Sequence, residues 1–450
     1  MLVKDLNYDY DYDKEEAAVA AACAIIFHQL LAARQACIEH HRSHQLYLCR
    51  RELLPNPRVG TPWQQLWDSQ EDRAFITTMG FDVATFRLLL EGPGWFGERW
   101  ESSPIPQNDV SRVGEPHTGR RSLDGAGALG LVLHYLSSAM LEVSLQQIFA
   151  VIPSTLNRYI EFAEEILFET LCSLNEAKIS MPRQVPKLQH LSSLIQARHP
   201  LLEGAFGSIN GLSLLAQESD EPELENATYN RWKTSHCINN VLVFSPEGES
   251  FPMSQIITAN DFVNNFVGVI ISAVLNFPGS WHDAHVAQPI FEQLHTKIPD
   301  GFYLVADTAF PQGTASIEGK IHAPLKSGQQ ITAEPIAQQY MLTVNRQLLS
   351  YCQTAEWGMR TVQGSFGRLR VPLKISSENH WARLLKTCMH LTNVHARCVG
   401  INQIRSVYMP IWKASEDEQL WLDLGDMVFG EIRRRDRVSC FHLEVVDNNE

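Results

Sequence analysis

Between residues 206 and 306 the chain carries four apolar, β-rich runs, and helical patterns occupy the chain on both sides of them. The runs are Phe206–Leu215, Ile238–Phe244, Val269–Leu275 and Phe302–Ala306. Apolar residues recur at helical spacing over residues 14–55, 122–174 and 333–386. A strand-rich centre flanked by helical blocks predicts an α+β protein.

Composition excludes several classes of protein. With 450 residues, 44% of them hydrophobic, the chain is long enough for two or three domains and is not wholly disordered. Its net charge of −14 argues against a protein that coats nucleic acid over its whole surface. Nine cysteines without a C-x-x-C pair fit neither a zinc ribbon nor a disulfide scaffold, and predict reduced thiols in an intracellular compartment.

Membrane insertion and secretion are not expected. The longest apolar stretches are Ala17–Ala33, which His28 and Gln29 interrupt, and Phe266–Phe277, which is shorter than the roughly 20 residues a span needs. The N-terminus is acidic, whereas a secretory signal begins with positive charge. We therefore expect a soluble protein with no membrane partner.

Residues 144–160 have the spacing of a helix-turn-helix. A short helix is predicted over 144–149, and Pro153 or Ser154 would start a second helix from which Arg158 projects. Two packed helices of an all-α domain explain the same pattern. If this segment contacts DNA, we expect Arg120 and Arg121 to contribute.

Basic residues are concentrated between residues 341 and 413. This segment holds Arg346, Arg360, Arg368, Arg370, Lys374, Arg383, Lys386, Arg397, Arg405 and Lys413, and its only acidic residues are Glu356 and Glu378. A basic segment within an acidic protein fits a surface for the phosphate backbone of DNA. The alternative is a solvated helical face balanced in space by the acidic stretch 218–225.

Three short motifs follow one another in the strand-rich region. They are the strand end Ile209-Asn210-Gly211, the turn Pro278-Gly279-Ser280-Trp281-His282-Asp283, and the strand end Ala306-Asp307-Thr308-Ala309-Phe310-Pro311. A carboxylate at the tip of a buried strand, such as Asp307, is costly unless a cation compensates it. A divalent metal ion would do so.

These motifs, together with Phe366-Gly367-Arg368-Leu369-Arg370 downstream, make the chain resemble the DDE-type transposases of the PIF/Harbinger class and the nuclease-like proteins derived from them. The resemblance covers roughly residues 120 to 410. It implies an RNase H-like mixed sheet flanked by helices, preceded by an all-α helix-turn-helix-like region. It also implies a site in which Mg²⁺ or Mn²⁺, bound by carboxylates, directs attack on a phosphodiester.

The family's site residues map onto this chain with departures. Asp307 matches the second carboxylate, but the first position is Asn210 and the usual third position is Gln363. Glu356 lies seven residues before Gln363, close to the same helical face, and is the alternative third acid. Asp283 matches a residue of the turn near the site, where it either contributes to metal binding or caps the following helix.

The resemblance predicts the following domain organisation: an N-terminal helical region and linker (1–116), a helix-turn-helix-like DNA-binding region (117–200), an RNase H-like nuclease domain (201–412) with an atypical insertion (249–268), and a C-terminal tail (413–450). DNA would bind through Arg158, Arg360, Arg368, Arg370 and Lys374. The resemblance allows a homo-oligomer or a separate DNA-targeting partner, and the DNA substrate implies nuclear residence.

Two functions remain open from the sequence. The first is a transposase-derived, metal-dependent DNA endonuclease or strand-transfer enzyme acting through Asn210, Asp307 and Glu356. The second is a catalytically dead DNA-binding or partner-binding protein that retains the fold. A neutral amide at position 210 favours the second for this chain, because it brings no charge to a metal ion.

Overall fold

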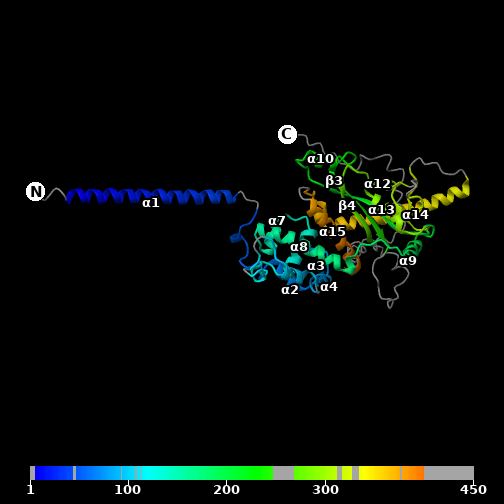
Figure 1. The fold of residues 1–450 in the computed structure, drawn as a ribbon, viewed down its shortest axis with the longest axis horizontal. Coiled ribbons are helices and arrows are strands. Elements are labelled where there is room, and N and C mark those ends of the chain that lie inside the picture. Colours follow the sequence, from blue (N-terminus) through cyan, green and yellow to red (C-terminus); the bar gives the residue numbers. More distant parts are fainter. Residues whose placement is uncertain are drawn as a thin grey trace, which may run out of the picture.

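The computed structural model describes residues 6–43, 47–92, 94–106, 109–111, 113–246, 268–311, 317–326, 334–374 and 378–399. Most of the insertion at 249–268 and the whole tail at 413–450 lie outside these residues. The elements before the sheet are α1 (Leu6–Ser43), η1 (Arg50–Glu52), α2 (Pro62–Ser69), α3 (Asp72–Met79), α4 (Val83–Leu90), α5 (Phe96–Ser102), η2 (Thr118–Arg120), α6 (Gly125–Ser137), α7 (Glu142–Phe149), α8 (Pro153–Ser173), η3 (Asn175–Ala177) and α9 (Val185–Gln196). They form the left part of the molecule in Figure 1, apart from α9, which lies beside the sheet.

The remaining elements build a sheet and its covering helices. The strands are β1 (Ala205–Leu215), β2 (Tyr229–Asn230), β3 (Ser235–Ser245), β4 (Val269–Pro278), β5 (Tyr303–Ala306) and β6 (Ile321–His322). The helices are α10 (Pro222–Thr228), α12 (Asp283–Val286), α13 (Gln288–Lys297), α14 (Pro335–Ser365), η4 (Gly367–Arg370), α15 (Glu378–Val394) and η5 (His395–Val399). All four β-rich runs expected from the sequence are strands, because their apolar residues are buried on both faces of a central sheet.

The sheet is mixed. β1 pairs antiparallel with β3, β3 pairs antiparallel with β2 and β4, β5 runs parallel to β1, and β6 runs parallel to β5. A mixed sheet with helices on both faces confirms the expected α+β architecture.

Strand register brings two candidate residues together. Ile209 of β1 is paired with Ala306 of β5 in a parallel ladder. The next residues along these strands are Asn210, in the middle of β1, and Asp307, which directly follows the carboxyl end of β5. The two residues therefore lie beside each other at the point where β5 ends.

The two faces of the sheet are covered differently. One face packs Ile209, Val243 and Leu304 against apolar residues of α9, α12 and α13. The other face packs Leu212 and Leu242 against α14, α15 and the helical region that precedes the sheet. α15 contacts both α8 and β4, so the helical region and this face share one continuous core.

The helix-turn-helix-like segment forms two consecutive helices. α7 ends at Phe149, and Pro153 occupies the first turn of α8, as its fixed φ favours. Arg121, expected to support DNA binding, is instead buried. Its guanidinium pairs with Asp109 at 2.6 Å and donates to the carbonyl of Ser103 at 2.7 Å, whereas the neighbouring Arg120 is exposed. The expectation for Arg121 is therefore wrong.

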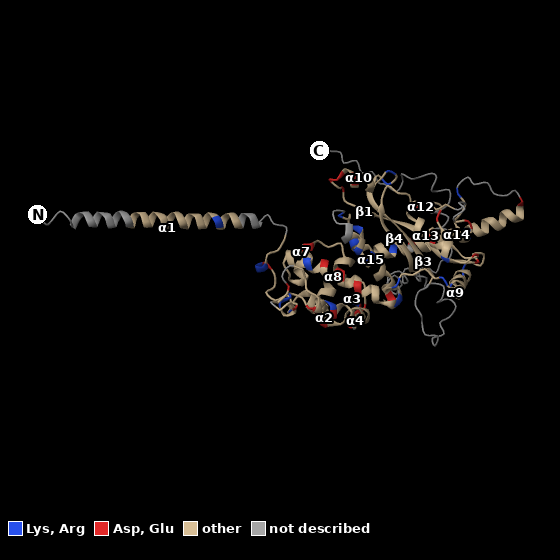
Figure 2. Ribbon diagram, in the orientation of Figure 1, with Lys and Arg blue, Asp and Glu red and all other residues tan. Residues whose placement is uncertain are grey.

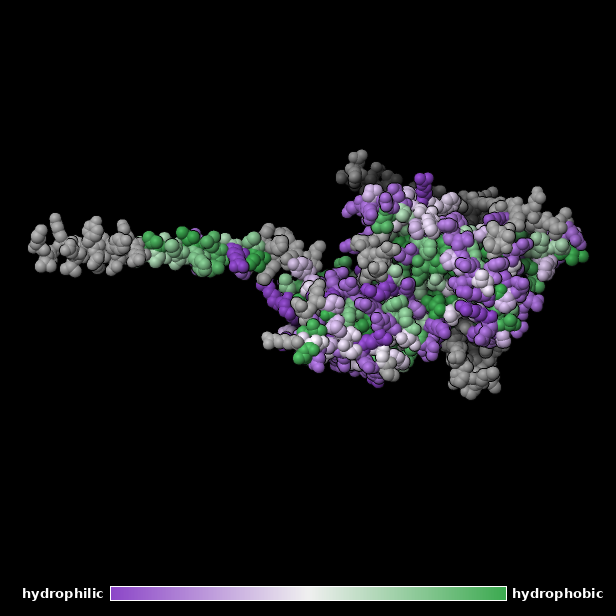
Figure 3. Space-filling view, viewed as in Figure 1, coloured by the Kyte–Doolittle hydropathy of each residue, from purple (hydrophilic) through white to green (hydrophobic). Residues whose placement is uncertain are grey.

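α1 extends away from the remainder of the molecule (Figure 1). None of its apolar segment Ala17–Ile38 is buried, and by length and composition alone the segment could cross a membrane. The described part of this helix is mainly green, and therefore hydrophobic, in Figure 3. The sequence analysis did not expect this stretch to span a membrane, because His28 and Gln29 interrupt it. In the structure both residues are exposed.

Candidate active site

Asn210 lies in the middle of β1, which continues to Leu215 and does not end here as the sequence suggested, whereas Asp307 directly follows the end of β5. Both side chains are half-buried. The Asp307 carboxylate accepts a hydrogen bond from the backbone N–H of Ala309 at 2.8 Å. The Asn210 side-chain oxygen accepts one from the N–H of Gly211 at 2.7 Å. Local backbone donors therefore engage one oxygen on each of the two side chains.

α14 brings a candidate for the third acidic position toward the end of β5. The Cys352 thiol donates to the carbonyl of Ala306 at 2.9 Å, which fixes this turn of α14 beside the end of β5. Burial, together with the negative charges of Asp307 and Glu356, raises the pKa of Cys352 to about 12. Glu356 is one turn beyond Cys352 and is exposed, whereas Gln363 lies about 16 Å farther along the helix than Cys352. Glu356 is thus the nearer of the two candidates for the third position.

Asp283 approaches the same place from the turn that follows β4. It lies in the first turn of α12, after His282, whose ring accepts a hydrogen bond from the N–H of Ala284 at 3.3 Å. Its carboxylate packs against Gly211 so closely that a Cβ there would stand 2.4 Å from Oδ2. Burial raises the pKa of Asp283, as does the nearby charge of Asp307, while Lys233 and His282 oppose that rise.

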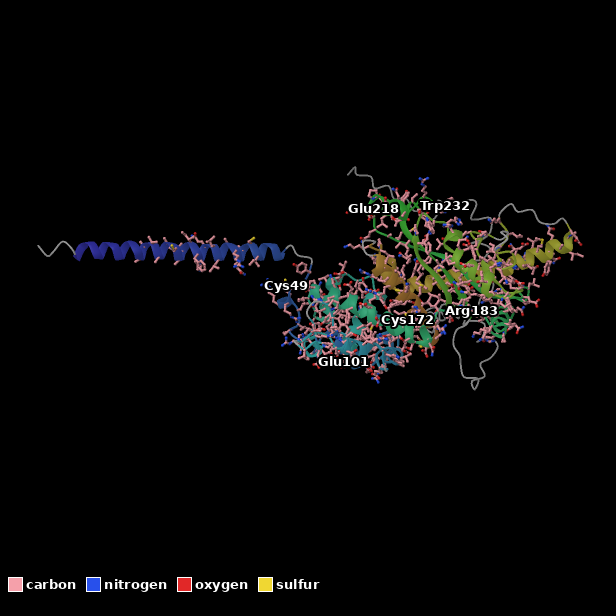
Figure 4. All side chains as sticks on the ribbon, in the orientation of Figure 1. Cys49, Glu101, Cys172, Arg183, Glu218 and Trp232 are labelled. Atoms are coloured by element: carbon pink, nitrogen blue, oxygen red, sulfur yellow. The ribbon has the colours of Figure 1, made fainter. Side chains whose placement is uncertain are left out.

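A polar network that the sequence analysis missed positions this turn. Ser213 donates to the Asn239 side-chain oxygen at 2.5 Å, and Lys233 donates to Ser213. The Asn239 amide then donates to the carbonyls of Trp281 at 2.7 Å and Gly279 at 3.2 Å. The network ties the turn to β1 and places the Lys233 charge near Asp283. Lys233 follows the exposed Trp232, which Figure 4 labels.

The register between β1 and β3 is the information that would have predicted this network. Ser213 and Asn239 are directly paired across β1 and β3. Gly211 and Ser213 also project from the same side of β1, since strand side chains alternate. The motifs alone do not predict this network, because it depends on which strands pair.

The residues that the structure describes at this place do not make a complete divalent-metal site. Among the described residues, His, Cys, Asp and Glu form no group of three or more that could hold a metal ion. Asn210 supplies an oxygen without charge, Asp283 has a raised pKa, and Glu356 is exposed. Mg²⁺ and Mn²⁺ favour sites rich in ionised carboxylates, so the donor set fits them poorly.

The basic residues expected to bind DNA have different surroundings. The Arg368 guanidinium lies 4.3 Å from the centre of the Tyr135 ring, and Arg370 donates to the carbonyls of Gln363 at 2.7 Å and Gly364 at 2.9 Å. Arg360 and Lys374 expose their side chains, and Arg158 is half-buried on α8. Arg368 and Arg370 therefore have structural contacts, while Arg360 and Lys374 stay accessible to a ligand.

Part of the chain matches a known protein family. Residues 262–393 match the family model described as DDE superfamily endonuclease. This segment includes Asp283, Asp307 and Glu356, begins after Asn210, and covers less than half of the chain. No curated protein and no solved structure matches. The match supports the DDE superfamily for this part of the chain.

Proposed function

We propose that this chain is a transposase-derived DNA-binding protein that retains the DDE architecture and has lost efficient metal-dependent cleavage. The observation that carries the proposal is the position of Asn210 beside Asp307. The two residues follow the paired positions Ile209 and Ala306, where a DDE nuclease places two carboxylates, and one of them is an amide.

DNA is the ligand that this architecture favours. The match to DDE superfamily endonucleases covers the turn that ends at Asp283 and the strand end at Asp307. The exposed Arg360 and Lys374 flank η4 and add positive charge near the same segment. The order of the motifs further supports the PIF/Harbinger class, and a DNA ligand supports nuclear residence.

The proposed loss of cleavage has a physical basis. Two metal ions about 4 Å apart activate water and stabilise the leaving oxygen in this type of hydrolysis. Replacing a carboxylate by an amide removes a negative charge from the ligands of both ions. Asp283 does not replace it, because it packs against Gly211 and burial favours its protonated form.

Binding and cleavage can be measured separately. The full chain is incubated with supercoiled plasmid in Mg²⁺, Mn²⁺ or EDTA, and complexes and nicked circles are resolved on gels. We expect retarded complexes in all three conditions and no nicked product. Efficient nicking that needs Mg²⁺ or Mn²⁺ would instead favour the active endonuclease, and absence of complexes would contradict a DNA-binding function.

A further inference from the structure

The described part of α1 exposes a long apolar surface. Six of its large apolar side chains are between 48% and 64% exposed, namely Val19, Ile25, Ile26, Phe27, Leu30 and Leu31. Arg34 is the only charged residue between Ala17 and Ile38, so this part of the helix is almost entirely tan in Figure 2. Keeping this much apolar surface in water is unfavourable, and an exposed patch of this kind marks a contact with a partner.

Six positions of α1 follow the spacing of a coiled coil. Separations of four and three residues, which define positions d and a, connect Val19, Cys23, Ile26, Leu30, Ala33 and Cys37. We call these six residues the seam, and they form one stripe about 27 Å long. His28 and Gln35 occupy position f, on the side of the helix opposite the seam. An apolar seam with polar side chains behind it predicts a second helix packed along it.

The charge along α1 favours a second copy of the same helix. Its sequence is acidic before Ala17, where Lys14 is accompanied by Asp9, Asp11, Asp13, Glu15 and Glu16. Toward its end the sequence holds Arg34 and Arg42 with the single acid Glu39. Two copies that run in opposite directions bring the acidic beginning of each helix near the basic end of the other, and their dipoles oppose. Two copies in the same direction would place the acidic beginnings side by side.

The position of α1 in the molecule permits this contact. The helix extends away from the helical region and the sheet, so a second helix can lie along it (Figure 1). In an antiparallel pair the remainders of the two chains stand at opposite ends of the two helices and do not collide. A lipid bilayer is the competing partner. It would enclose the polar side chains of His28, Gln29 and Arg34 in hydrocarbon, which is costly.

We propose that two copies of this chain associate through α1, with the helices antiparallel and the seam at their interface. Position a of one helix then faces position d of the other. Ile26 lies beside Leu30 of the second copy, and Cys23 lies beside Ala33 of the second copy. The association goes beyond the proposed DNA-binding function and does not depend on it.

The first test compares two pairs of substitutions that differ only in their place on the helix. The seam variant is Ile26→Gln/Leu30→Gln, and the control variant is Ile25→Gln/Leu31→Gln, which removes the same residue types from positions c and b. All four side chains are exposed, so the melting temperatures of the full-length proteins should agree. By size-exclusion chromatography with light scattering, we expect the natural chain and the control variant at twice 50.9 kDa and the seam variant at 50.9 kDa.

The second test determines the direction of the helices. Ala33→Cys adds a thiol to the seam, and Ala32→Cys, at position c, is its control. After mild oxidation, peptide mapping should show Cys23 of one copy linked to the thiol introduced at position 33 of the other. The thiol introduced at position 32 should form no such link. Links between equal positions, such as Cys23 to Cys23, would indicate parallel helices and overturn the antiparallel arrangement.

Three results would overturn the association itself. The first is a natural chain that stays at 50.9 kDa over a concentration series. The second is an equal effect of the seam and control variants on the dimer. The third comes from flotation with vesicles of phosphatidylcholine and phosphatidylserine. A monomeric natural chain that floats with the vesicles, and that both variants release equally, would assign α1 to a lipid surface instead. Loss of DNA binding in any of these proteins bears on the proposed function and leaves the dimer unchanged.

Discussion

The carboxylate of Asp283 lies against the Cα of Gly211, so that a side chain at position 211 would collide with it. An ideal Cβ on residue 211 stands 2.4 Å from Asp283 Oδ2 and 2.5 Å from Cγ. The glycine after Asn210 is therefore required by close packing rather than by backbone conformation. This contact joins the turn after β4 to the middle of β1.

Gly211→Ala should displace Asp283 and lower the free energy of unfolding by about 1–3 kcal/mol, because the added methyl overpacks a tight contact. Urea denaturation measures the change. Gly119→Ala is the control, since a Cβ at Gly119 meets nothing within 4 Å. In an Asp283→Ala background the cost of Gly211→Ala should shrink, and an unchanged cost would show that Asp283 is not what excludes the side chain.

Cys352 reports on the charges around the candidate site. Burial raises its pKa to about 12, with contributions from Asp307 and Glu356, so the thiol stays protonated near neutral pH and should resist iodoacetamide. Asp307→Asn should lower that pKa and increase the alkylation rate of Cys352 severalfold. The rate is followed by mass spectrometry of the Cys352 peptide. Asp300→Asn, at an exposed carboxylate bonded to Lys320, is the control. Equal rates in all three proteins would place Asp307 away from the thiol.

Arg121→Ala should destabilise the fold by about 3–5 kcal/mol, because it leaves Asp109 without its cation in a largely buried environment. The neighbouring Arg120→Ala should change stability by less than about 0.5 kcal/mol, since Arg120 is exposed. Thermal and urea unfolding of the two variants measure these changes in stability. Similar small effects of both would refute a structural role for Arg121.

Glu164 gives the fold a pH dependence. Burial raises its pKa from 4.5 to about 8 even though Arg383, at 3.6 Å, favours the charged form. The folded state then holds a proton that the unfolded state releases, so stability falls as pH rises from about 4.5 to about 8, by up to about 1.4 kcal/mol per pH unit. Glu164→Gln should remove that loss, whereas the exposed Glu165→Gln should keep it. Urea denaturation at several pH values tests this, and an unchanged slope in Glu164→Gln would contradict it.

Much of the fold could be predicted from the sequence. The apolar runs at β1, β3, β4 and β5 are long enough and sharply enough bounded to identify strands without tertiary information. The motif order also predicted that positions 210 and 307 belong to one site. The parallel register of β1 and β5 then places them beside each other where β5 ends.

Contacts that depend on packing between distant elements could not be predicted. From the sequence, Arg368 and Arg370 were expected to bind DNA. In the structure, Arg368 lies over the Tyr135 ring on α6, and Arg370 donates to carbonyls at the end of α14. Lys187 and Arg397 likewise line one pocket only because the fold brings α9 and η5 together. Sequence spacing carries no information about either pairing.

The central claim is that the amide at position 210 is what limits cleavage, and plasmid nicking by restored variants tests it most directly. Supercoiled plasmid is incubated in Mn²⁺ with the natural chain, Asp307→Ala, Asn210→Asp, Asn210→Asp/Asp307→Ala, and the control Asn157→Asp at an exposed position of α8. We expect nicking by Asn210→Asp alone. Nicking by the natural chain that survives Asp307→Ala would contradict the account and place the active site elsewhere.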